Sequence, residues 1–407
     1  MKPVRLSIVL THPIQYYAPW FRFIAQNAPA IELKVHYCVM PTPEQQGAEF
    51  NESFTWDGSL FEGYDYVILR QPPHKMITNS SAFFGVTVPE VVRSIRAESP
   101  AVVLVPGWYS VSLVGAAIAA RRANIPVIYR GDSQLLTPWG APTRAKRART
   151  RAILALYTHY LNVGKRNYEY LRHYSIPDSR IFFSPHCVDN EFFATLAAGS
   201  DRKAERASLG IADDSFVALF AGKLEAKKRP WELIEAAAQM PDPPTIVIAG
   251  SGDAEDRCRR AAAESPARVI FLGFQNQSEI ARVYGLADCL VLPSDYGETW
   301  GLVVNEALAV GIPCIVSDQV GCGPDLIEHG ETGYIAPFAD VKSLAYYMDR
   351  LRSDVRRGQD FGPACRKKAS AYSFVTATYG LQEAVENAVN RSDRNNASLR
   401  LQVADAI

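Results

Sequence analysis

The sequence predicts an α/β protein of two doubly wound domains that face one another across a cleft. Short runs rich in Val, Ile and Leu alternate with helical stretches along most of the 407 residues, which is typical of an α/β fold. The runs are continuously apolar, as expected for parallel strands covered on both faces. The series stops near residue 190 and restarts near residue 215, and a chain of this length exceeds one ordinary core. Such sheets bind ligands beyond the carboxyl ends of their strands.

The first series predicts an N-terminal domain at residues 1–195. Its strands are mostly separated by alanine-rich or amphipathic helices, such as the one at 112–123. Residues 190–213 are polar and small, and we interpret them as the linker. The predicted strands are 4–10, 31–38, 101–105, 125–130, 160–163 and 180–184.

The second series predicts a C-terminal domain at residues 196–370. A helix over 371–390 is expected to close the chain and to return toward the N-terminal domain, and the polar segment 391–407 is expected to be a frayed tail. The predicted strands of this domain are 215–222, 245–250, 268–273, 288–293 and 313–318.

Composition narrows the class of protein. Apolar residues make up 48% and charged residues 21%, which is normal for a soluble globular protein. The formal net charge is zero, so no global field favours nucleic acid. The start of the chain resembles a strand more than a signal peptide, and no run approaches the roughly 18 apolar residues of a membrane span. The seven cysteines lack any C-x-x-C pair, which is typical of reduced thiols. We therefore predict a cytoplasmic protein.

The stretch at 295–318 carries the densest chemical signal. A strand that ends near Pro293 leads through a glycine-containing loop into a helix that begins near Gly301. The first amides of that helix, at 300–303, form an anion site suited to a diphosphate. Gly297 and Gly301 allow a ligand to approach the backbone closely.

Two carboxylates flank this helix start. Glu298 lies just before it, and Glu306 lies about a turn and a half inside it. One carboxylate can therefore reach past the phosphates, while the other accepts hydrogen bonds from vicinal hydroxyls. The alternative is that Glu298 only favours the helix dipole and that Glu306 is a solvated helix residue.

A basic turn from Lys223 to Arg229 follows the predicted strand at 215–222. Fixed cations at the end of a strand stabilise a departing diphosphate, and a solvated basic turn is the alternative. No Asp-x-Asp sequence occurs in the chain. We therefore expect no metal site, because lysines and helix amides can neutralise the diphosphate without one.

Several segments, in the correct order, resemble the family 4 retaining glycosyltransferases, which have the GT-B fold of two Rossmann-like domains. ETWGLVVNEALAVGIP, beginning at Glu298, resembles the E-x7-E motif of that family, and VGCGPDLIEHGETGYIAP continues the similarity. FAGKLEAKKRPWELIEA, beginning at Phe220, resembles the family's strand, basic loop and helix. Weaker similarity at 11–25 and 162–193 extends the match over most of residues 1–390.

The resemblance implies a role for each matching residue. Glu306 would bind the ribose hydroxyls of the donor nucleotide, and Glu298 would contact the donor sugar. Lys223 and either Lys227 or Lys228 would neutralise the diphosphate, with Lys228 assigned first. The family commonly has Arg at the first of these lysines, so the bidentate fork is lost here. Further donor-binding positions are Gly222, Phe274, Gly297, Thr299, Trp300, Gly301 and Leu302.

The function that the resemblance implies is a retaining hexosyl transfer from a nucleotide-diphosphate sugar, such as a UDP-sugar, to a hydroxyl of a glycan or lipid-linked acceptor. Polysaccharide or cell-envelope glycan synthesis is the expected setting, with no cofactor. A sugar-nucleotide epimerase of the same architecture is one alternative, and a non-catalytic nucleotide-sugar-binding partner subunit is another. A nicotinamide oxidoreductase is disfavoured, because no full Gly-x-Gly-x-x-Gly follows the first strand.

The N-terminal domain offers candidates for the opposite wall of the cleft. His12 and Tyr16 follow the first strand, and Arg130 and Asp132 follow another. We assign His12 and Asp132 to acceptor or donor-sugar contact, and the alternative is capping and loop packing. If His12 were a general base, an inverting displacement would become available. His186 is interpreted as a hinge residue with hydrogen bonds of its own.

A basic segment at 143–160 is a candidate for membrane contact. It places five cations within nine residues and then turns apolar. An interfacial helix on anionic lipid would suit a lipid-linked acceptor, so peripheral association with the inner face of the membrane is one expectation. A solvated helix start that runs into the core is the other.

Overall fold

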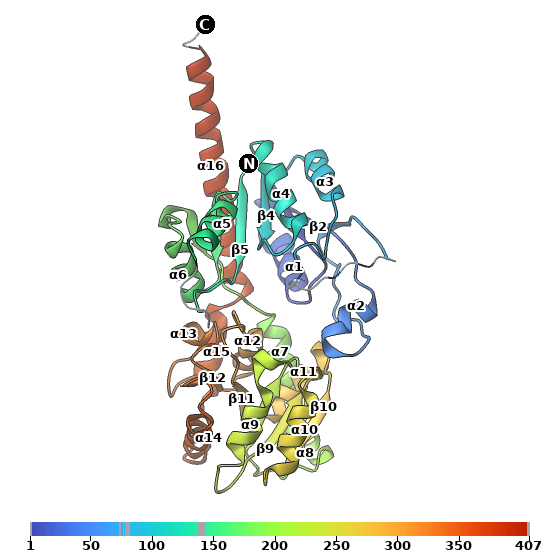
Figure 1. Ribbon diagram of the computed structural model, residues 1–407, viewed down its shortest axis with the longest axis vertical. Helices are drawn as coiled ribbons and strands as arrows, with labels where there is room; N and C mark the ends of the chain where they lie inside the picture. The colour runs from blue at the N-terminus through green and yellow to red at the C-terminus, as the bar shows by residue number, and fades with distance from the viewer. Residues whose placement is uncertain (1, 73–74, 76, 78–81, 137–142, 405–407) are drawn as a thin grey trace.

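The computed structural model describes residues 2–72, 75, 77, 82–136 and 143–404, with side chains up to residue 391. It consists of two α/β domains arranged end to end, each built on one parallel sheet with helices on both faces (Figure 1). The predicted fold class is confirmed. Each sheet has its most apolar strands at the centre, where helices cover both faces.

The N-terminal sheet has the strand order β3-β2-β1-β4-β5-β6-β7, and each recorded strand pair is parallel. β3 was not predicted, because DYVI is short, begins with a charge and is only half-buried. The strands are β1 (Val4–Leu10), β2 (Ile31–Tyr37), β3 (Asp65–Ile68), β4 (Val102–Pro106), β5 (Val127–Gly131), β6 (His159–Asn162) and β7 (Ile181–Phe183). The helices are α1 (Tyr17–Asn27), α2 (Pro43–Gly47), η1 (Ala48–Phe50), α3 (Glu90–Glu98), α4 (Val111–Arg122), α5 (Arg144–Leu154), α6 (Lys165–His173) and η2 (Asp178–Arg180).

The C-terminal sheet has the strand order β10-β9-β8-β11-β12-β13. The strands are β8 (Val217–Ala221), β9 (Thr245–Ala249), β10 (Val269–Gly273), β11 (Cys289–Leu292), β12 (Cys314–Ser317) and β13 (Gly333–Ala336). The helices that follow them are η3 (Ala226–Lys228), α9 (Pro230–Ala237), α10 (Glu255–Glu264), α11 (Gln277–Leu286), α12 (Leu302–Val310), α13 (Gly323–Leu326), α14 (Val341–Arg356) and α15 (Gly362–Ala371).

The segment interpreted as a linker is helical instead. α7 (Asn190–Ala198) and α8 (Arg202–Ser208) occupy it, and α7 lies against α11 and α12 of the C-terminal domain. Asp189 and Asp201 cap the two helices with their side chains, and Phe193 is buried, so the segment has both the caps and the apolar contact that a helix needs. The chain therefore crosses between domains before Asn190, along residues 184–189.

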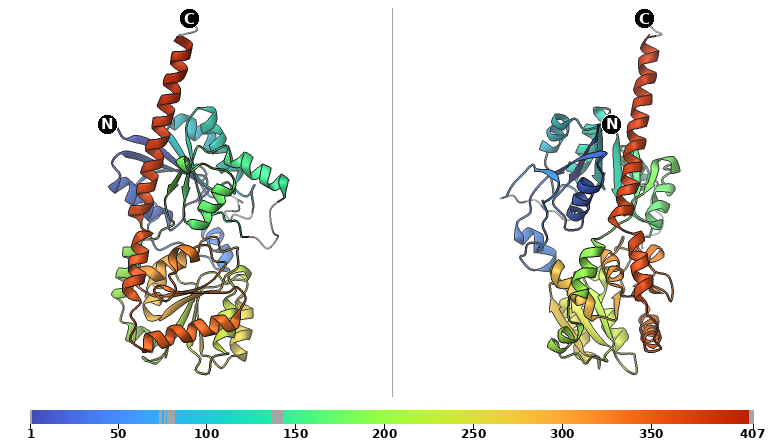
Figure 2. Two further views of the ribbon diagram at one scale, coloured as in Figure 1. Left: turned by 90° about the vertical axis from the view of Figure 1, so that its left-hand side faces the viewer. Right: turned by 180° about the vertical axis from the view of Figure 1, so that it is seen from behind.

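The last helix returns to the N-terminal domain. α16 (Phe374–Ala404) runs along β6 and β7, as the two side views show (Figure 2). Trp20 of α1 donates its indole N–H to Thr378 at 3.0 Å, and Ser184 donates to the carbonyl of Ala377 at 2.8 Å. The segment expected to fray from residue 391 continues this helix to Ala404, because it contains no Gly or Pro that would end it.

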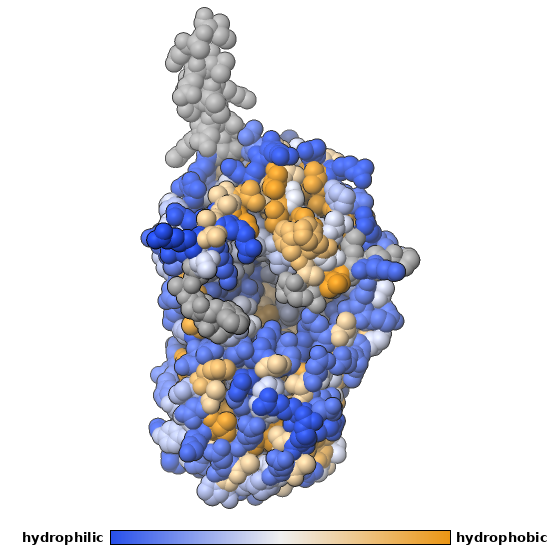
Figure 3. Space-filling model, viewed as in Figure 1, coloured by the Kyte–Doolittle hydropathy of each residue, from blue (hydrophilic) through white to orange (hydrophobic). Residues whose placement is uncertain are grey.

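The carboxyl ends of the two sheets face each other. A recess lies between the domains on the face shown in Figure 3, and polar contacts join its walls, as described below. All seven cysteines are buried and none forms a disulfide. No helix in the described part of the chain is long and apolar enough to cross a membrane.

Candidate active site between the domains

The loop between β11 and α12 has the geometry that the sequence predicts. Gly301 adopts φ 102°, and a Cβ at this position would lie 3.0 Å from a core leucine methyl, so only glycine fits without strain. The loop is fixed by two backbone bonds: Gly321 donates to Glu298 at 2.9 Å and Cys322 donates to Trp300 at 3.0 Å. The first amides of α12 have no intrahelical acceptor and are positioned at the base of the cleft.

Lys228 and Glu298 form a buried ion pair in this cleft. The Lys228 ammonium lies 2.5 Å from Glu298 Oε2, and each residue is only 9% exposed. Burial alone would raise the pKa of Glu298, but Lys228, Lys227 and Lys223 outweigh it and hold the pKa below its ordinary value. Glu298 is therefore an anion held between cations, placed just ahead of the α12 amides.

The other two lysines of the basic turn have carboxylate partners of their own. Lys223 is paired with Glu49 of the N-terminal domain, and Lys227 lies 3.4 Å from Glu225. Burial, followed by the neighbouring lysines, lowers the pKa of Lys223 despite the nearby Glu225. Lys228 therefore contacts Glu298, the residue assigned to the donor sugar, whereas Lys227 pairs with Glu225 in the same turn.

Glu306 lies in a very different environment from Glu298. It is partly buried on α12 and accepts a hydrogen bond of 2.7 Å from the hydroxyl of Tyr284 on α11. Burial raises the pKa of Glu306 to about 7, and the Tyr284 hydrogen bond only partly offsets this. Tyr284 was not predicted as a site residue, because it lies on α11, 22 residues before Glu306, and only the tertiary fold brings the two together.

Asp132, a candidate from the sequence analysis, lies where the two domains meet. Its carboxylate accepts a hydrogen bond of 2.7 Å from the Thr299 hydroxyl in the opposite domain, and the same oxygen lies 3.9 Å from His186 Nε2. Burial holds the pKa of His186 well below its ordinary value, and Arg130 adds to the effect. His186 also accepts a bond from Asn305 through its carbonyl. Hydrogen bonding therefore helps to fix His186 within the segment that crosses between the domains.

His12 also faces this cleft, and it is neutral. Its Nδ1 lies 2.9 Å from the Thr11 hydroxyl. Burial lowers the pKa of His12 to about 4, and Lys223 of the opposite domain contributes to the lowering. Tyr16, which was named with His12 but not assigned a role, is buried near Glu306, Glu298 and Asp132, and burial together with these carboxylates raises its pKa.

The remaining donor-binding candidates differ in their surroundings. Gly222 has φ 128°, and a Cβ at this position would lie 3.8 Å from the end of the Lys228 side chain, so Gly222 lies beneath that lysine. The Trp300 indole instead packs inward and donates to Asn305 at 2.8 Å, which leaves only its backbone for a ligand. Gly297 is held by a bond of 2.7 Å to Asp295. Leu302 lines a small space together with Tyr16, Arg130 and His186.

A segment of the N-terminal domain that the sequence analysis did not single out reaches across the cleft. We call residues 42–61 the arm. Phe54 of the arm stacks on Phe274 with ring centroids 4.0 Å apart. Asp57 accepts hydrogen bonds from the backbone and hydroxyl of Ser278, at 3.0 and 2.5 Å, at the first turn of α11. Together with Glu49, these contacts close one end of the cleft.

Gly250 and Gly252, which follow β9, have a structural role. Both have positive φ, and a Cβ at Gly250 would lie 1.9 Å from the carbonyl oxygen of Gly222. The close approach of the loops after β8 and β9 therefore requires glycine. The described residues contain no group of three or more His, Cys, Asp or Glu side chains arranged to hold a metal ion.

Comparison with known proteins places this geometry in a family context. Residues 201–368, which form the C-terminal domain, match the family model of glycosyl transferases group 1. D-inositol 3-phosphate glycosyltransferase from Mycobacterium sp. (strain KMS) is 36% identical over 182 residues, an alignment that covers 43% of this chain and 39% of the relative. The predicted resemblance to glycosyltransferases is confirmed. The alignment spans only about two fifths of the length of such curated relatives.

Solved structures share the whole two-domain fold. Anabaena HepE in complex with UDP superposes with a TM-score of 0.72 at 16% identity, covering 94% of this chain and 99% of that protein. UDP-N-acetylglucosamine 2-epimerase from Rickettsia bellii superposes with a TM-score of 0.63 at 14% identity, covering 97% and 99%. At these identities the likeness establishes the GT-B fold, which transferases and epimerases have in common.

Proposed function

We propose that the protein is a retaining glycosyltransferase that moves a hexosyl group from a nucleotide-diphosphate sugar to a hydroxyl acceptor. The observation that carries the proposal is the buried Lys228–Glu298 pair at the start of α12, with Lys223 on the same wall and Glu306 farther along the helix. The cations and helix amides would face the phosphates of the donor, and the second carboxylate, Glu306, would face its ribose.

The diphosphate lies against Lys223, Lys228 and the first amides of α12 in this proposal. When the bond from the sugar to the diphosphate breaks, negative charge develops on the departing phosphate, and preorganised donors stabilise that charge. Lys223 currently holds Glu49, so a phosphate oxygen would take the place of that carboxylate. No metal is required in this arrangement, and we expect EDTA to leave donor binding unchanged.

The sugar and the ribose are assigned to the two glutamates. Glu306 accepts hydrogen bonds from the ribose hydroxyls, and Glu298 contacts the donor sugar's hydroxyls. Asp132 faces the same space from the N-terminal wall, because its partner Thr299 is next to Glu298 in sequence. Phe274, which the arm covers, is assigned to the base pocket.

Transfer with retention proceeds on one face of the sugar. The bond from the anomeric carbon to the phosphate oxygen breaks, the acceptor oxygen bonds to the same face, and the departing phosphate takes the acceptor's proton. His12 is neutral and faces the site, but its pKa of about 4 makes it a weak base at neutral pH. This favours retention over an inverting displacement with His12 as general base.

The first test is a binding panel of UDP, GDP, ADP and CDP by calorimetry, with and without EDTA. We expect one diphosphate to bind saturably, to be insensitive to EDTA and to lose about ten- to a hundredfold in affinity in Lys228→Ala, because one charge-assisted contact is lost. The anomeric configuration of the product, read by NMR, then tests retention. An inverted product would refute it.

An epimerase is the second candidate, because the epimerase from R. bellii has the same fold. The two functions differ in what they require. A transferase turns over its donor only with an acceptor, apart from slow hydrolysis, whereas an epimerase changes the donor sugar alone. NMR of each nucleotide sugar incubated with the protein and no acceptor separates them.

We propose that α5 contacts a membrane through its charge alone, without insertion. The residues from 143 to 149 are exposed and include four cations, and the start of the helix is capped by Thr143. The larger apolar residues that follow pack toward the N-terminal core: Leu154 and Tyr157 are buried, and Ile153 and Leu156 are partly buried against them. The helix therefore attracts anionic lipid by charge and does not insert. Flotation with anionic and neutral vesicles tests this, and absence from the anionic fraction would refute it.

A further inference from the structure

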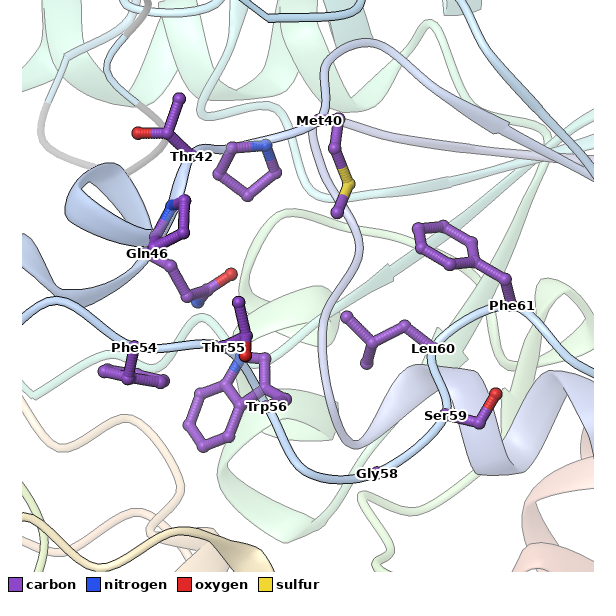
Figure 4. Close-up of a pocket in the computed structure, with 12 residues that line it drawn as sticks. Met40, Thr42, Gln46, Phe54, Thr55, Trp56, Gly58, Ser59, Leu60 and Phe61 are labelled. Carbon is purple, nitrogen blue, oxygen red and sulfur yellow. The ribbon is translucent and has the colours of Figure 1, made fainter.

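The arm encloses a cavity that no part of the proposed donor site uses. Its volume is about 290 Å³, near the lower end of the roughly 300–1,000 Å³ typical of small-molecule sites. Figure 4 shows Met40, Leu60 and Phe61 on one side of the space and Gln46, Thr55 and Trp56 on the other. The lining residues are Met40, Pro41, Thr42, Pro43, Gln46, Phe54, Thr55, Trp56, Gly58, Ser59, Leu60 and Phe61.

The lining combines aromatic faces with a few polar groups. Phe54, Trp56 and Phe61 supply the rings, and the amide of Gln46 points toward the middle of the space (Figure 4). The indole N–H of Trp56 is itself buried, so Trp56 contributes its ring to the lining, and Thr42, Gln46 and Ser59 contribute polar side chains. The cavity thus suits a ligand with an apolar face and hydroxyls at its edge.

The cavity adjoins the carboxyl end of β2, which pairs with β1. Its wall at Met40 follows β2, and the neighbouring residue Val39 donates a backbone bond of 2.9 Å to Thr11, next to His12 at the end of β1. Its opposite wall is held against the donor-binding domain by Asp57 and by the stacking of Phe54 on Phe274. A ligand in this cavity is therefore on the N-terminal side of the cleft, adjacent to the arm's contacts with the C-terminal domain.

We propose that this cavity binds a hydroxylated ring of the acceptor, a single pyranose or cyclitol, with an apolar ring face against the aromatic wall. The inference rests on the proposed function and narrows its acceptor to a glycan or polyol end. The volume admits one such ring. The C–H face of the ring buries apolar area against Trp56 and Phe61, while its hydroxyls reach the amide of Gln46.

Saturation-transfer NMR of the full-length protein with UDP present tests the assignment. The hydroxylated probes are methyl α-glucopyranoside, methyl α-galactopyranoside, methyl α-mannopyranoside and myo-inositol, and the apolar probes are benzyl alcohol and 1-octanol. We expect at least one hydroxylated ring to receive saturation. Its signal should fall about fivefold or more in both variants, because Trp56→Leu removes an aromatic face and Gln46→Leu removes a hydrogen-bonding amide from the lining. Phe84→Ala is the matched control, since Phe84 is an aromatic residue of the same domain that is 74% exposed and lies outside the cavity.

Other outcomes overturn the acceptor proposal or the proposed transferase. Binding of the apolar probes alone would assign the cavity to an aglycone or lipid, and equal signals in wild type and Gln46→Leu would place the ring elsewhere. If UDP binds and no hydroxylated ring does, the acceptor assignment fails while the donor site stands. If a ring binds in a cavity-dependent manner but no nucleotide diphosphate does, the proposed transferase fails and the ring site remains. Circular dichroism and the melting temperature show whether Trp56→Leu is folded, and Gln46→Leu carries the test if it is not.

Discussion

The two glutamates of the cleft differ in charge behaviour although they lie on one loop and helix. Glu298 is held ionised by Lys228 and its neighbours, whereas burial raises the pKa of Glu306 to about 7. Environments that separate the pKa values of two carboxylates are typical of sites in which the two have different tasks. Single substitutions at these positions are therefore expected to change different observables.

Nucleotide affinity should depend on the ionisation of Glu306. An ionised carboxylate accepts ribose hydrogen bonds better than a protonated one, so wild-type affinity should rise with pH and level off above about pH 7. Below that, it should fall by up to about tenfold per pH unit. Glu306→Gln should bind about ten- to a hundredfold more weakly at pH 8 and lack this dependence. Calorimetry of both proteins between pH 5.5 and 8.5 measures this dependence. The ratio of the wild-type affinity to the Glu306→Gln affinity cancels the titration of the phosphate itself, near pH 6. A constant ratio would contradict the ribose assignment.

The same substitution should stabilise the free protein at high pH. The pKa of Glu306 is raised from 4.5 to about 7 on folding, so its contribution to stability is present below pH 4.5 and is lost as pH rises through about 7. Glu306→Gln removes that loss and should increase the free energy of unfolding by roughly 1–3 kcal/mol at pH 8, and by much less at pH 5. Urea unfolding at both pH values checks the difference. A variant that is less stable at pH 8 would count against the buried, ionised carboxylate.

Glu49 should compete with the donor diphosphate for Lys223. The pair is partly exposed, so its strength is modest, and Glu49→Gln should tighten UDP binding by up to about fivefold while leaving the affinity for uridine unchanged. Glu52→Gln is the matched control, because Glu52 is an exposed carboxylate on the same arm and its substitution changes the net charge equally. Calorimetry at one ionic strength compares them. Weaker UDP binding in Glu49→Gln would mean that Glu49 positions Lys223 instead.

The loop from β11 into α12 depends on one backbone conformation. Gly301 has φ 102°, and a Cβ there would approach a leucine methyl at 3.0 Å, so Gly301→Ala should cost about 1–3 kcal/mol of stability and weaken nucleotide binding by displacing the α12 amides. Gly330→Ala is the control, because Gly330 has φ 81° but open space around it. It should cost stability without affecting UDP binding. Urea unfolding and calorimetry on both variants separate strain from loss of the anion site, and unchanged binding in Gly301→Ala would exclude the amides.

Elements with strong local signals could be predicted from the sequence, and those fixed by distant contacts could not. The apolar strands such as β4, the glycine loop and the α12 start follow local rules for burial and helix ends. β13 was missed because GYIA is short and follows a glycine-rich turn. α7 was missed because small polar residues obscure its buried Phe193.

The candidate site shows the same division. Glu298 and Glu306 belong to one contiguous motif after β11, and Lys228 belongs to another after β8, so these residues could be found in the sequence. Glu49 and Tyr284 could not, because nothing in their local sequence marks them and only the packing of distant segments brings them to the cleft. Long-range pairing of this kind leaves no periodic signal in a single sequence.

Contacts on both sides of the cleft join the two domains. On one side the chain crosses along residues 184–189, and Lys165 donates its backbone N–H to Asp325 at 3.1 Å across the domains. On the other side only the arm makes contact, through exposed residues such as Asp57 and Asn51. The first side has buried partners, including Tyr372 on Asp325. We therefore expect the domains to move about the crossing segment, with the arm as the contact that opens.

Asp57 is the residue on which the closed arrangement should depend most. It accepts both the backbone N–H and the hydroxyl of Ser278 at the start of α11, a favourable place for a carboxylate because of the helix dipole. Asp57→Ala should shift the free protein toward an open form, seen as a larger radius of gyration in small-angle X-ray scattering, and saturating UDP should partly reverse the change if the donor also bridges the domains. Asp253→Ala is the control, because it removes one exposed contact between the same surfaces, the bond from Asn51 at 3.0 Å. An unchanged radius in Asp57→Ala would show that the arm does not hold the cleft closed, and an equal change in both variants would show that Asp57 is not the contact on which closure depends most.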